Sequence, residues 1–364
     1  MEETLSEREL SPVLVIGAGL VGASVAQALT RAGLVVHLSD KVSSHARVAA
    51  SRGAGTTAPP QPADVRLVVV AVPPGALPRV IAKSLATYPR ATVTDVGSVK
   101  GTVLAELRAS GIDLSRYVGS HPMAGSQRVG PMTASPDLFV DRTWVVTPHD
   151  TSAAHAVLDV QAVAALCGAR RVTMGAAHHD EAVAQVSHLP HLASVLVAER
   201  LNDVPPEHLQ LAGQGLRDVT RIAGSDPQLW REIIGANSAA VRAELTVLRD
   251  NLDALIGVLD ADGDLAPILA AGRDGTRALP GKHGLASTSY AHVVVEIPDA
   301  PGALARLFRD IETAGVNVED VSIEHDVARE VGWLSVQVAP DRADDLTAVM
   351  HAAGWTVRDH EPQP

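Results

Sequence analysis

Short apolar runs alternate with stretches of helical period over the first half of the chain. The apolar runs cover residues 12–16, 35–38, 65–72, 91–96, 143–147 and 170–174. The helical periods between them include residues 23–32, 76–86 and 152–166. The run at 65–72 has no polar alternation and stops at Pro73-Pro74, which is typical of a parallel strand buried on both faces. This pattern predicts an α/β domain built on a mostly parallel sheet.

The pattern becomes helical after residue 177. Residues 178–201 have a helical period that Pro190 interrupts, and residues 237–259 form a long amphipathic stretch. The apolar stripe of this stretch consists of Val241, Leu245, Leu248, Leu252, Leu255, Ile256 and Leu259. Such a stripe needs a partner, which is either a helix of the same chain or a second subunit.

A third pattern occupies the end of the chain. It predicts strands at 291–297, 317–325, 332–338 and 355–358, with helices at 303–314 and 343–353. This order is that of a split βαβ sandwich. We therefore expect a tail at 1–11, an α/β domain with a doubly wound, Rossmann-type sheet at 12–176, an all-helical domain at 177–280, a linker at 281–289 and an α+β domain at 290–364.

The first βαβ unit contains a dinucleotide-binding pattern. Gly17, Gly19 and Gly22 follow the first strand and open the first helix, and Asp40 ends the second strand. In this context the first glycine permits a tight turn, the second lets a pyrophosphate approach, and the third lets the helix pack on the sheet. The helix N-terminus favours phosphate, and a carboxylate at Asp40 favours NAD over NADP. A glycine turn with only a structural role is the alternative.

Composition narrows the class of protein. The net charge of −12 argues against nucleic acid or an anionic membrane as the main partner. Cys167 is the only cysteine, which excludes an internal disulfide and suits a reducing compartment, but the sequence assigns it no role. The acidic N-terminus lacks a signal-peptide core, and no apolar run has membrane-spanning length. We expect a cytoplasmic protein.

A histidine at a strand end is the first candidate for chemistry. The segment at 119–127 reads Gly-Ser-His-Pro-Met-Ala-Gly-Ser-Gln and follows a short strand that ends at Val118. Pro122 biases His121 toward an extended backbone, so its imidazole should stand where α/β sheets bind ligands. There it can exchange a proton with the ligand. A histidine that merely caps a loop is the alternative.

Ser98 has a similar position after the strand at 91–96, within Asp-Val-Gly-Ser-Val-Lys-Gly. This places it near the expected nicotinamide end of the coenzyme, where it can make a catalytic hydrogen bond. It can also cap a helix that starts at Val99, and the two roles are compatible.

Two histidines, His188 and His191, flank Pro190. The proline lacks an N–H donor, which predicts a kink or a helix restart, and residues three apart share a helix face. A role in binding substrate competes with structural hydrogen bonds to neighbouring helices. It also competes with a zinc site that includes Asp180, although the spacing matches no familiar set of ligands. We expect no metal.

Arg217 and Arg221 supply positive charge at i,i+4 spacing, just before a helix start at Ser225-Asp226-Pro227. A guanidinium that binds a carboxylate bidentately is a natural anchor for an anionic substrate. Surface ion pairs, which contribute little stability, are the alternative.

These motifs together make the chain resemble the prephenate/arogenate dehydrogenases. The likeness is carried by GxGxxG, Asp-Val-Gly-Ser-Val-Lys-Gly, Gly-Ser-His-Pro-Met-Ala-Gly-Ser, Ser-His-Leu-Pro-His and Asp-Val-Thr-Arg-Ile-Ala…Asp-Pro…Trp. It covers residues 12–360 and implies an NAD-dependent oxidative decarboxylation of a cyclohexadienol carboxylate. With prephenate the product is 4-hydroxyphenylpyruvate, a precursor of tyrosine.

The resemblance also implies roles for individual residues. His121 takes the proton of the ring hydroxyl, and Ser98 helps to fix His121 and the nicotinamide. Arg221 holds the ring carboxylate, and His188 or His191 lies near the pyruvyl end. The other implied substrate contacts are Ser126, Gln127 and Trp230, and the implied NAD contacts are Gly17, Gly19, Leu20, Val21, Gly22, Asp40, Val72, Pro73 and Ser98. The family counterpart of Trp230 reaches the site across a dimer interface, which implies an intertwined homodimer.

Gln127 bears on the choice of substrate. Several members of the family have a glutamate there, which could pair with the amino group of arogenate, whereas a neutral amide suits a keto acid. We therefore favour prephenate, with arogenate, or both cyclohexadienyl substrates, as the alternative.

The C-terminal pattern resembles ACT domains through Pro-Asp-Ala-Pro-Gly-Ala-Leu at 298–304 and Ala-Gly-Val-Asn-Val at 314–318. ACT domains bind small amino acids, which implies feedback control by tyrosine or another aromatic amino acid. Gly302 would let the ligand approach the backbone, and Asn317 would contact it. An ordinary helix-initiating turn and an ordinary turn residue are the alternatives.

Two rival functions remain. One is a dehydrogenase of the same build that acts on an unrelated hydroxy acid, and the paired histidine motifs count against it. The other is a non-catalytic amino-acid sensor, which would bind its ligand without forming NADH. The presence of His121, Ser98 and Arg221 counts against the sensor.

Overall fold

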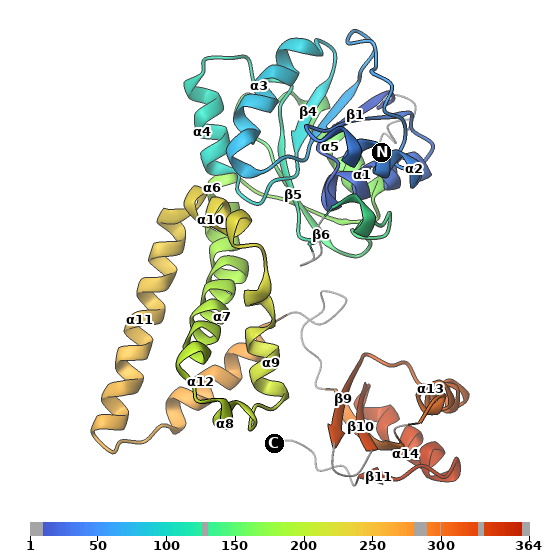
Figure 1. The fold of residues 1–364 in the computed structure, drawn as a ribbon, viewed down its shortest axis with the longest axis vertical. Helices are drawn as coiled ribbons and strands as arrows, with labels where there is room; N and C mark the ends of the chain where they lie inside the picture. Colours follow the sequence, from blue (N-terminus) through green and yellow to red (C-terminus); the bar gives the residue numbers. More distant parts are fainter. Residues whose placement is uncertain (1–9, 126–129, 280–289, 299, 327–330, 359–364) are drawn as a thin grey trace. The chain divides into compact units, whose positions relative to one another are not determined.

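The computed structural model describes residues 10–125, 130–279, 290–298, 300–326 and 331–358. By its internal contacts the chain divides into two compact units, residues 1–250 and 251–364. Figure 1 shows both units as a ribbon coloured by position in the sequence. The domain boundaries expected at 176/177 and 280/290 stay a prediction.

The first unit contains the expected α/β sheet. Its strands are β1 (Val13–Ile16), β2 (Val36–Ser39), β3 (Leu67–Val70), β4 (Thr92–Asp95), β5 (Gly119–Pro122), β6 (Thr143–Thr147) and β7 (Arg170–Thr173). The first four pair in parallel in the order β2-β1-β3-β4, β5 pairs antiparallel with β6, and β6 pairs in parallel with β7. A parallel bridge from Val93 to Tyr117 joins the two groups. The carboxyl ends of β1, β3, β4 and β5 therefore share one edge.

Helices cover both faces of this sheet (Figure 1). Residues of α1 (Leu20–Arg31) and α5 (Ala154–Leu166) form one core with Val13 and Val15, and residues of α3 (Leu77–Thr87) and α4 (Gly101–Ala109) form another with Leu14. Successive strand residues point to opposite faces, so the unbroken apolar runs of the sequence fill both cores.

The helical part of the first unit follows the sheet. It consists of α6 (Ala176–Val183), a π-helical turn (Ala184–His188), α7 (Leu189–Arg200), α8 (Pro206–Leu209), α9 (Gln214–Thr220), a 3-10 turn (Arg221–Gly224), α10 (Pro227–Ala236) and α11 (Ser238–Asp260), which runs into the second unit. The irregularity predicted around Pro190 is present as the π-helical turn at Ala184–His188, which passes directly into α7 with the proline in its first turn. Asp226 caps α10 as predicted, by accepting a 2.9 Å hydrogen bond from the N–H of Gln228.

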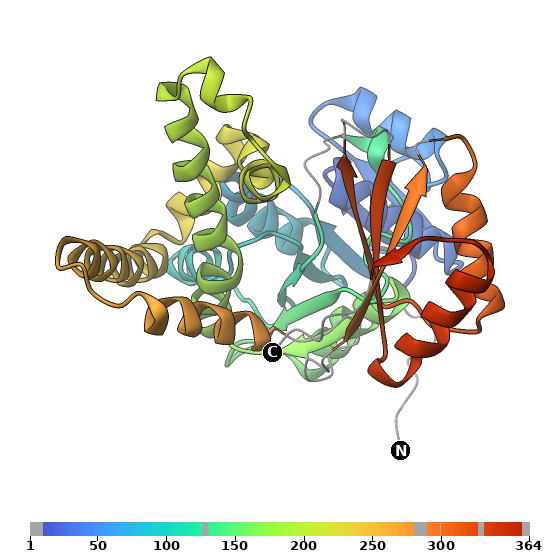
Figure 2. The ribbon, with the colours of Figure 1, turned by 90° about the horizontal axis from the view of Figure 1, so that it is seen from below.

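The second unit ends in a four-stranded antiparallel sheet. Its elements are α12 (Ala266–Arg277), β8 (Ala291–Pro298), α13 (Ala303–Thr313), β9 (Asp320–Asp326), β10 (Val331–Val338), α14 (Ala343–Ala352) and β11 (Val357–Arg358). The strand order is β11-β8-β10-β9, and α13 and α14 cover one face (Figure 2). The predicted order of strands and helices is present. The expected linker at 281–289 lies outside the described residues.

None of the helices in the described ranges is both long enough and apolar enough to span a membrane.

Candidate active site

The turn after β1 has the shape that a dinucleotide requires. Gly17 has φ of +102°, and a Cβ there would lie 2.1 Å from the carbonyl oxygen of Ala71. A Cβ on Gly22 would lie 2.0 Å from the carbonyl oxygen of Gly17. Around Gly19, by contrast, a Cβ would meet no atom within 4 Å, and no described side chain caps the helix that Gly19 starts. The first N–H groups of α1 can therefore face a phosphate.

Asp40 lies at the mouth of this turn. Its Oδ2 accepts a 2.6 Å hydrogen bond from the N–H of Ala18, and its Oδ1 accepts one of 2.7 Å from the N–H of Val42. The two backbone donors fix a carboxylate next to the glycine turn, where it can accept hydrogen bonds from a ribose and repel a 2′-phosphate. The turn and Asp40 together fit NAD.

Val72 and Pro73 follow β3 at the same sheet edge, and Val72 is partly exposed. Their predicted contact with the coenzyme agrees with this placement and stays a prediction.

His121 is the third residue of β5, opposite Val145 of β6. The strand starts at Gly119, so the expectation that it ends at Val118 was wrong: the Gly-Ser-His-Pro motif itself forms the strand. Pairing with β6 keeps the backbone of this motif extended as far as Pro122. The imidazole is partly exposed near the carboxyl end of the strand, as expected.

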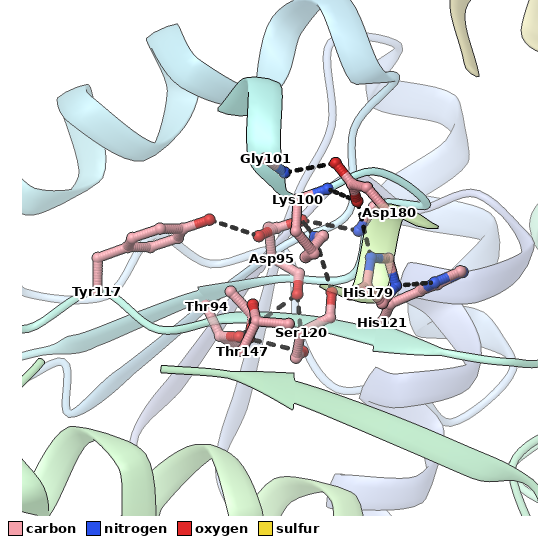
Figure 3. A network of polar contacts seen from close by, with 12 residues as sticks. Thr94, Asp95, Lys100, Gly101, Tyr117, Ser120, His121, Thr147, His179 and Asp180 are labelled. Carbon is pink, nitrogen blue, oxygen red and sulfur yellow. Dashed lines mark hydrogen bonds and ion pairs between the residues drawn. The ribbon is translucent and has the colours of Figure 1, made fainter. Parts of the chain in front are cut away.

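A chain of three side chains runs from His121 into α6 (Figure 3). The Nδ1 of His121 lies 2.9 Å from the Nε2 of His179, and the Nδ1 of His179 lies 2.8 Å from the Oδ1 of Asp180. Asp180 in turn accepts backbone hydrogen bonds of 2.9 Å from Lys100 and 2.7 Å from Gly101 at the start of α4. His179 and Asp180 are buried. The sheet and the helical part of the unit are thus joined through the histidine at the site.

A buried ion pair lies beneath this chain. The Nζ of Lys100 contacts the Oδ1 of Asp95 and donates a 2.8 Å hydrogen bond to the carbonyl oxygen of Ser120, the residue before His121. Asp95 also accepts hydrogen bonds of 2.8 Å from the N–H of Gly97 and from the hydroxyl of Tyr117. Burial lowers the pKa of Lys100, and the Asp95 carboxylate opposes that shift. The network fixes the backbone that carries His121.

Burial also keeps the site histidines neutral. Desolvation, with smaller contributions from His179 and Lys100, lowers the pKa of His121 well below the ordinary histidine value. Burial lowers the pKa of His188 to about 4, although Asp180 opposes the shift. The pKa of His191 is lowered by the same cause. Neutral imidazoles at pH 7 can accept a proton, which is what a general base requires.

His188 has a fixed donor. The amide nitrogen of Asn237 donates a 2.7 Å hydrogen bond to the backbone oxygen of Asp180 and lies 3.2 Å from the Nδ1 of His188. Because that nitrogen can only donate, the Nδ1 of neutral His188 is the acceptor and its Nε2 carries the proton. His188 therefore presents an N–H group on its other side.

Trp230 lies beside both histidines within one chain. Its ring stacks on His191 with centroids 3.5 Å apart and planes 3° from parallel, and it meets His188 edge-on at 6.1 Å. The histidine pair and Trp230 therefore form one cluster within the chain. The approach of Trp230 to a second subunit stays a prediction.

Ser98 lies in a bend between β4 and α4 and is partly exposed. The idea that it caps a helix starting at Val99 is wrong, because α4 starts at Gly101 and its first N–H groups are taken by Asp180. Among the described residues its hydroxyl has no hydrogen-bond partner, so a contact with His121 stays a prediction.

Arg221 is exposed where α9 passes into the 3-10 turn, and this turn packs against α7, the helix of His191. Arg217 is exposed one turn earlier. The structure places the Arg221 turn beside the histidine helix, and its role as a carboxylate anchor stays a prediction. Ser126 and Gln127 lie outside the described residues.

A metal site and a ligand site in the C-terminal domain are the two other candidates from the sequence. Within the described ranges, no group of three or more His, Cys, Asp or Glu side chains is placed to hold a metal ion. In the second unit, Gly302 starts α13 with φ of +89° and open space around it, whereas the amide of Asn317 donates a 2.6 Å hydrogen bond to Glu319. Asn317 thus has a local partner, which agrees with a turn role.

The sequence reasoning missed His179, Lys100 and Asn237, and considered Asp180 only as a metal ligand. The His-Asp pair at 179–180 was visible, but which of two adjacent histidines faces the sheet depends on where α6 starts. The helix starts at Ala176 and packs against α4, which is distant in sequence.

Comparison with known families assigns both parts of the first unit to one family. Two family models match: "Prephenate dehydrogenase, nucleotide-binding domain" over residues 25–173 and "Prephenate dehydrogenase, dimerization domain" over residues 175–267. A curated relative, "Probable prephenate dehydrogenase NovF" of Streptomyces niveus, is 34% identical over 355 residues, which are 94% of this chain and 98% of the relative.

Two solved structures are also similar. Prephenate dehydrogenase from A. aeolicus, in complex with hydroxyphenyl propionate and NAD+, is 27% identical, with a TM-score of 0.66 over 75% of this chain and 99% of its own. Arogenate dehydrogenase from Synechocystis is 26% identical, with a TM-score of 0.62 over 72% of this chain and 96% of its own.

Proposed function

The chain belongs to the prephenate dehydrogenase family, and on that premise we propose that it oxidises prephenate with NAD to 4-hydroxyphenylpyruvate and CO2. The observation that carries the proposal is the partly exposed imidazole of His121 at the carboxyl end of β5, held through its Nδ1 by the buried His179. A base at this edge of the sheet agrees with an alcohol oxidation beside a bound dinucleotide.

NAD, when bound, supplies the acceptor for the hydride that leaves C4 of the ring. In this proposal the turn of Gly17, Gly19 and Gly22, with Leu20 and Val21, holds its pyrophosphate, and Asp40 holds a ribose. Val72, Pro73 and Ser98 hold the rest of the nucleotide at the same sheet edge.

His121 moves the proton. It accepts the proton of the ring hydroxyl as the hydride departs, which leaves a carbonyl at C4. The bond between the ring and its carboxylate then breaks, its electron pair makes the ring aromatic, and CO2 leaves. The former carbonyl oxygen becomes the phenol oxygen, to which His121 can return the proton. General-base assistance of this kind contributes roughly 10²–10⁴ in rate.

Cationic and N–H groups orient the dianionic substrate. Arg221 binds the ring carboxylate in this proposal, and the N–H group of His188 or the imidazole of His191 faces the pyruvyl end. Trp230 closes the histidine cluster against water by stacking on His191. Ser126 and Gln127 complete the contacts, and the neutral amide of Gln127 favours the keto acid.

Initial rates of NADH formation with prephenate and with arogenate, each with NAD and NADP, test this function. Prephenate with NAD should give the highest kcat/KM. A large preference for arogenate would overturn the choice of substrate, and this outcome is of interest because of the likeness to the Synechocystis arogenate dehydrogenase. Ligand binding without NADH formation would favour the amino-acid sensor.

A homodimer is part of the proposal. On α11 the stripe residues Leu248, Leu252, Ile256 and Leu259 are 36–55% exposed in the single chain, so a second subunit can cover them. Sizing of the purified protein tests this, and a species of 38 kDa alone would contradict it.

A regulatory role for the C-terminal sheet is proposed as well, as an ACT domain that binds tyrosine or another aromatic amino acid. The element order and the left-handed Gly302 support it. Truncation near Ser287 should abolish inhibition by tyrosine, and a truncated chain that responds like the full chain would refute it.

A further inference from the structure

We infer that His179 and Asp180 are positioning residues that fix which nitrogen of His121 carries its proton, and so make the Nε2 of His121 the base. The inference deepens the proposed function and rests on it for the identity of the reaction. Its own evidence is the hydrogen-bond chain from α4 through Asp180 and His179 to His121 (Figure 3).

The direction of each hydrogen bond follows from the backbone. The N–H groups of Lys100 and Gly101 can only donate, and they point at the two oxygens of Asp180, at 2.9 and 2.7 Å. A carboxylate at the N-terminus of a helix such as α4 is favoured as the anion. Asp180 is therefore an acceptor on both oxygens, so the Nδ1 of His179 must carry a proton and donate to it over 2.8 Å.

The same logic extends to His121. In a neutral His179 with its proton on Nδ1, the Nε2 has a lone pair and accepts. The Nδ1 of His121, 2.9 Å away, must then be the donor. This leaves the lone pair of His121 on Nε2, where it can receive the proton of the substrate hydroxyl. The imidazolium so formed is stabilised through His179 by the anionic Asp180.

The chain is built into the fold and is not a surface contact. His179 is 1% exposed and Asp180 is 8% exposed, and Asn237 also binds the backbone oxygen of Asp180. The neighbouring His178 is exposed and lies on the same helix. Substitutions at 178 and 179 therefore form a matched pair.

Nitrogen NMR of the full chain labelled with [15N]histidine tests the inference without substrate or coenzyme. The His121→Asn variant identifies the signals of His121 by their loss. We expect His121 with its proton on Nδ1 in the wild-type chain and in His178→Phe, and a mixture of tautomers in His179→Phe. A proton on Nε2 in the wild-type chain, as a charged His179 would impose, overturns the inference, as does an unchanged His121 in His179→Phe.

Kinetics supply the second readout. Asp180→Asn can keep one oxygen toward the N–H of Lys100 and the Nδ1 of His179, but it removes the anion that stabilises the imidazolium of His121 through His179; the corresponding change in serine proteases lowers turnover by about 10⁴. We expect kcat with prephenate to fall by at least about 10², with KM nearly unchanged and the acid limb of kcat/KM moved to lower pH. His179→Gln keeps an oxygen acceptor for the Nδ1 of His121, so its kcat should be higher than that of His179→Phe. If His179→Phe does not bind NAD, His179→Gln is used in its place. A loss of kcat without a shift of the acid limb would indicate a merely structural role and overturn the inference.

The two readouts separate the inference from the proposed function. If the wild-type chain does not oxidise prephenate while the NMR result holds, the proposed function fails and the positioning of His121 stands. If prephenate is oxidised while His121 has its proton on Nε2, the proposed function stands and the inference about His121 fails.

Discussion

The buried Lys100–Asp95 ion pair allows a quantitative prediction, because both side chains are almost fully buried, at 1% and 0% exposure. Lys100→Met keeps the apolar stem and removes the ammonium group. Among the described residues, Asp95 then keeps the N–H of Gly97 and the hydroxyl of Tyr117 as partners, and the carbonyl oxygen of Ser120 loses the hydrogen bond from Lys100.

Removal of one partner of a buried ion pair costs about 3–5 kcal/mol, since an uncompensated charge stays buried. For a unit of the size of residues 1–250, each kcal/mol shifts Tm by roughly 2–4 °C. The Tm of the first unit should therefore fall by roughly 6–20 °C. The double variant Asp95→Asn/Lys100→Met should recover much of the loss, because neutral replacements for a buried pair are often tolerated.

Differential scanning calorimetry of the full chain measures this. The transition of the first unit is identified by its rise on addition of NAD, since ligand that binds only the folded form stabilises it. Lys83→Met, at an exposed position of α3, is the control and should change stability by less than about 0.5 kcal/mol. The reasoning would be refuted if the stability of the Lys100→Met chain lay within about 1 kcal/mol of the wild type. It would also be refuted if the double variant were no more stable than Lys100→Met alone.

Three further predictions concern the site. Asp40→Asn should raise kcat/KM with NADP relative to NAD, because the charge that repels a 2′-phosphate is gone, and unchanged coenzyme selectivity would count against Asp40 as the discriminator. Arg221→Met should lower kcat/KM for prephenate by roughly 10–100-fold, as expected for loss of a charged hydrogen bond of about 1.5–3 kcal/mol, and equal kinetics would exclude it as the anchor. The lowered pKa of His121 means that its neutral form persists as pH falls, so kcat/KM should stay level from pH 7 to below the ordinary histidine pKa of about 6.5 and decline only at more acidic pH. A decline centred above that value would contradict burial as the cause.

Sequence pattern was sufficient where local rules decide the structure. The strand–glycine–helix–strand–acid order around Gly17 and Asp40 leaves few alternatives, and the runs at 143–147 and 170–174 match β6 and β7 within a residue. The helix α2 (Ser43–Ser51) was not predicted, and the side chains it buries are the two small ones of Ala46 and Ala49.

Sequence pattern failed where contacts between residues far apart in the sequence decide the local structure. β5 begins at Gly119 because β6 pairs with it, 28 residues away at Thr147, and an apolar run alone placed the strand too early. Asp180 caps α4 from 79 residues away, which displaced the local candidate Ser98. The orientation of His121 depends on the same long-range contact through His179, so the histidine could be found from the sequence, but its hydrogen-bond partner could not.

The central claim is that His121 removes the proton of the ring hydroxyl while the coenzyme binds independently of it. Its most direct test is the turnover of the His121→Asn chain with prephenate and NAD, measured as NADH absorbance together with the Kd of NAD. We predict that turnover falls by about 10²–10⁴ while the Kd of NAD changes little. A His121→Asn chain that forms NADH at the wild-type rate would contradict the account.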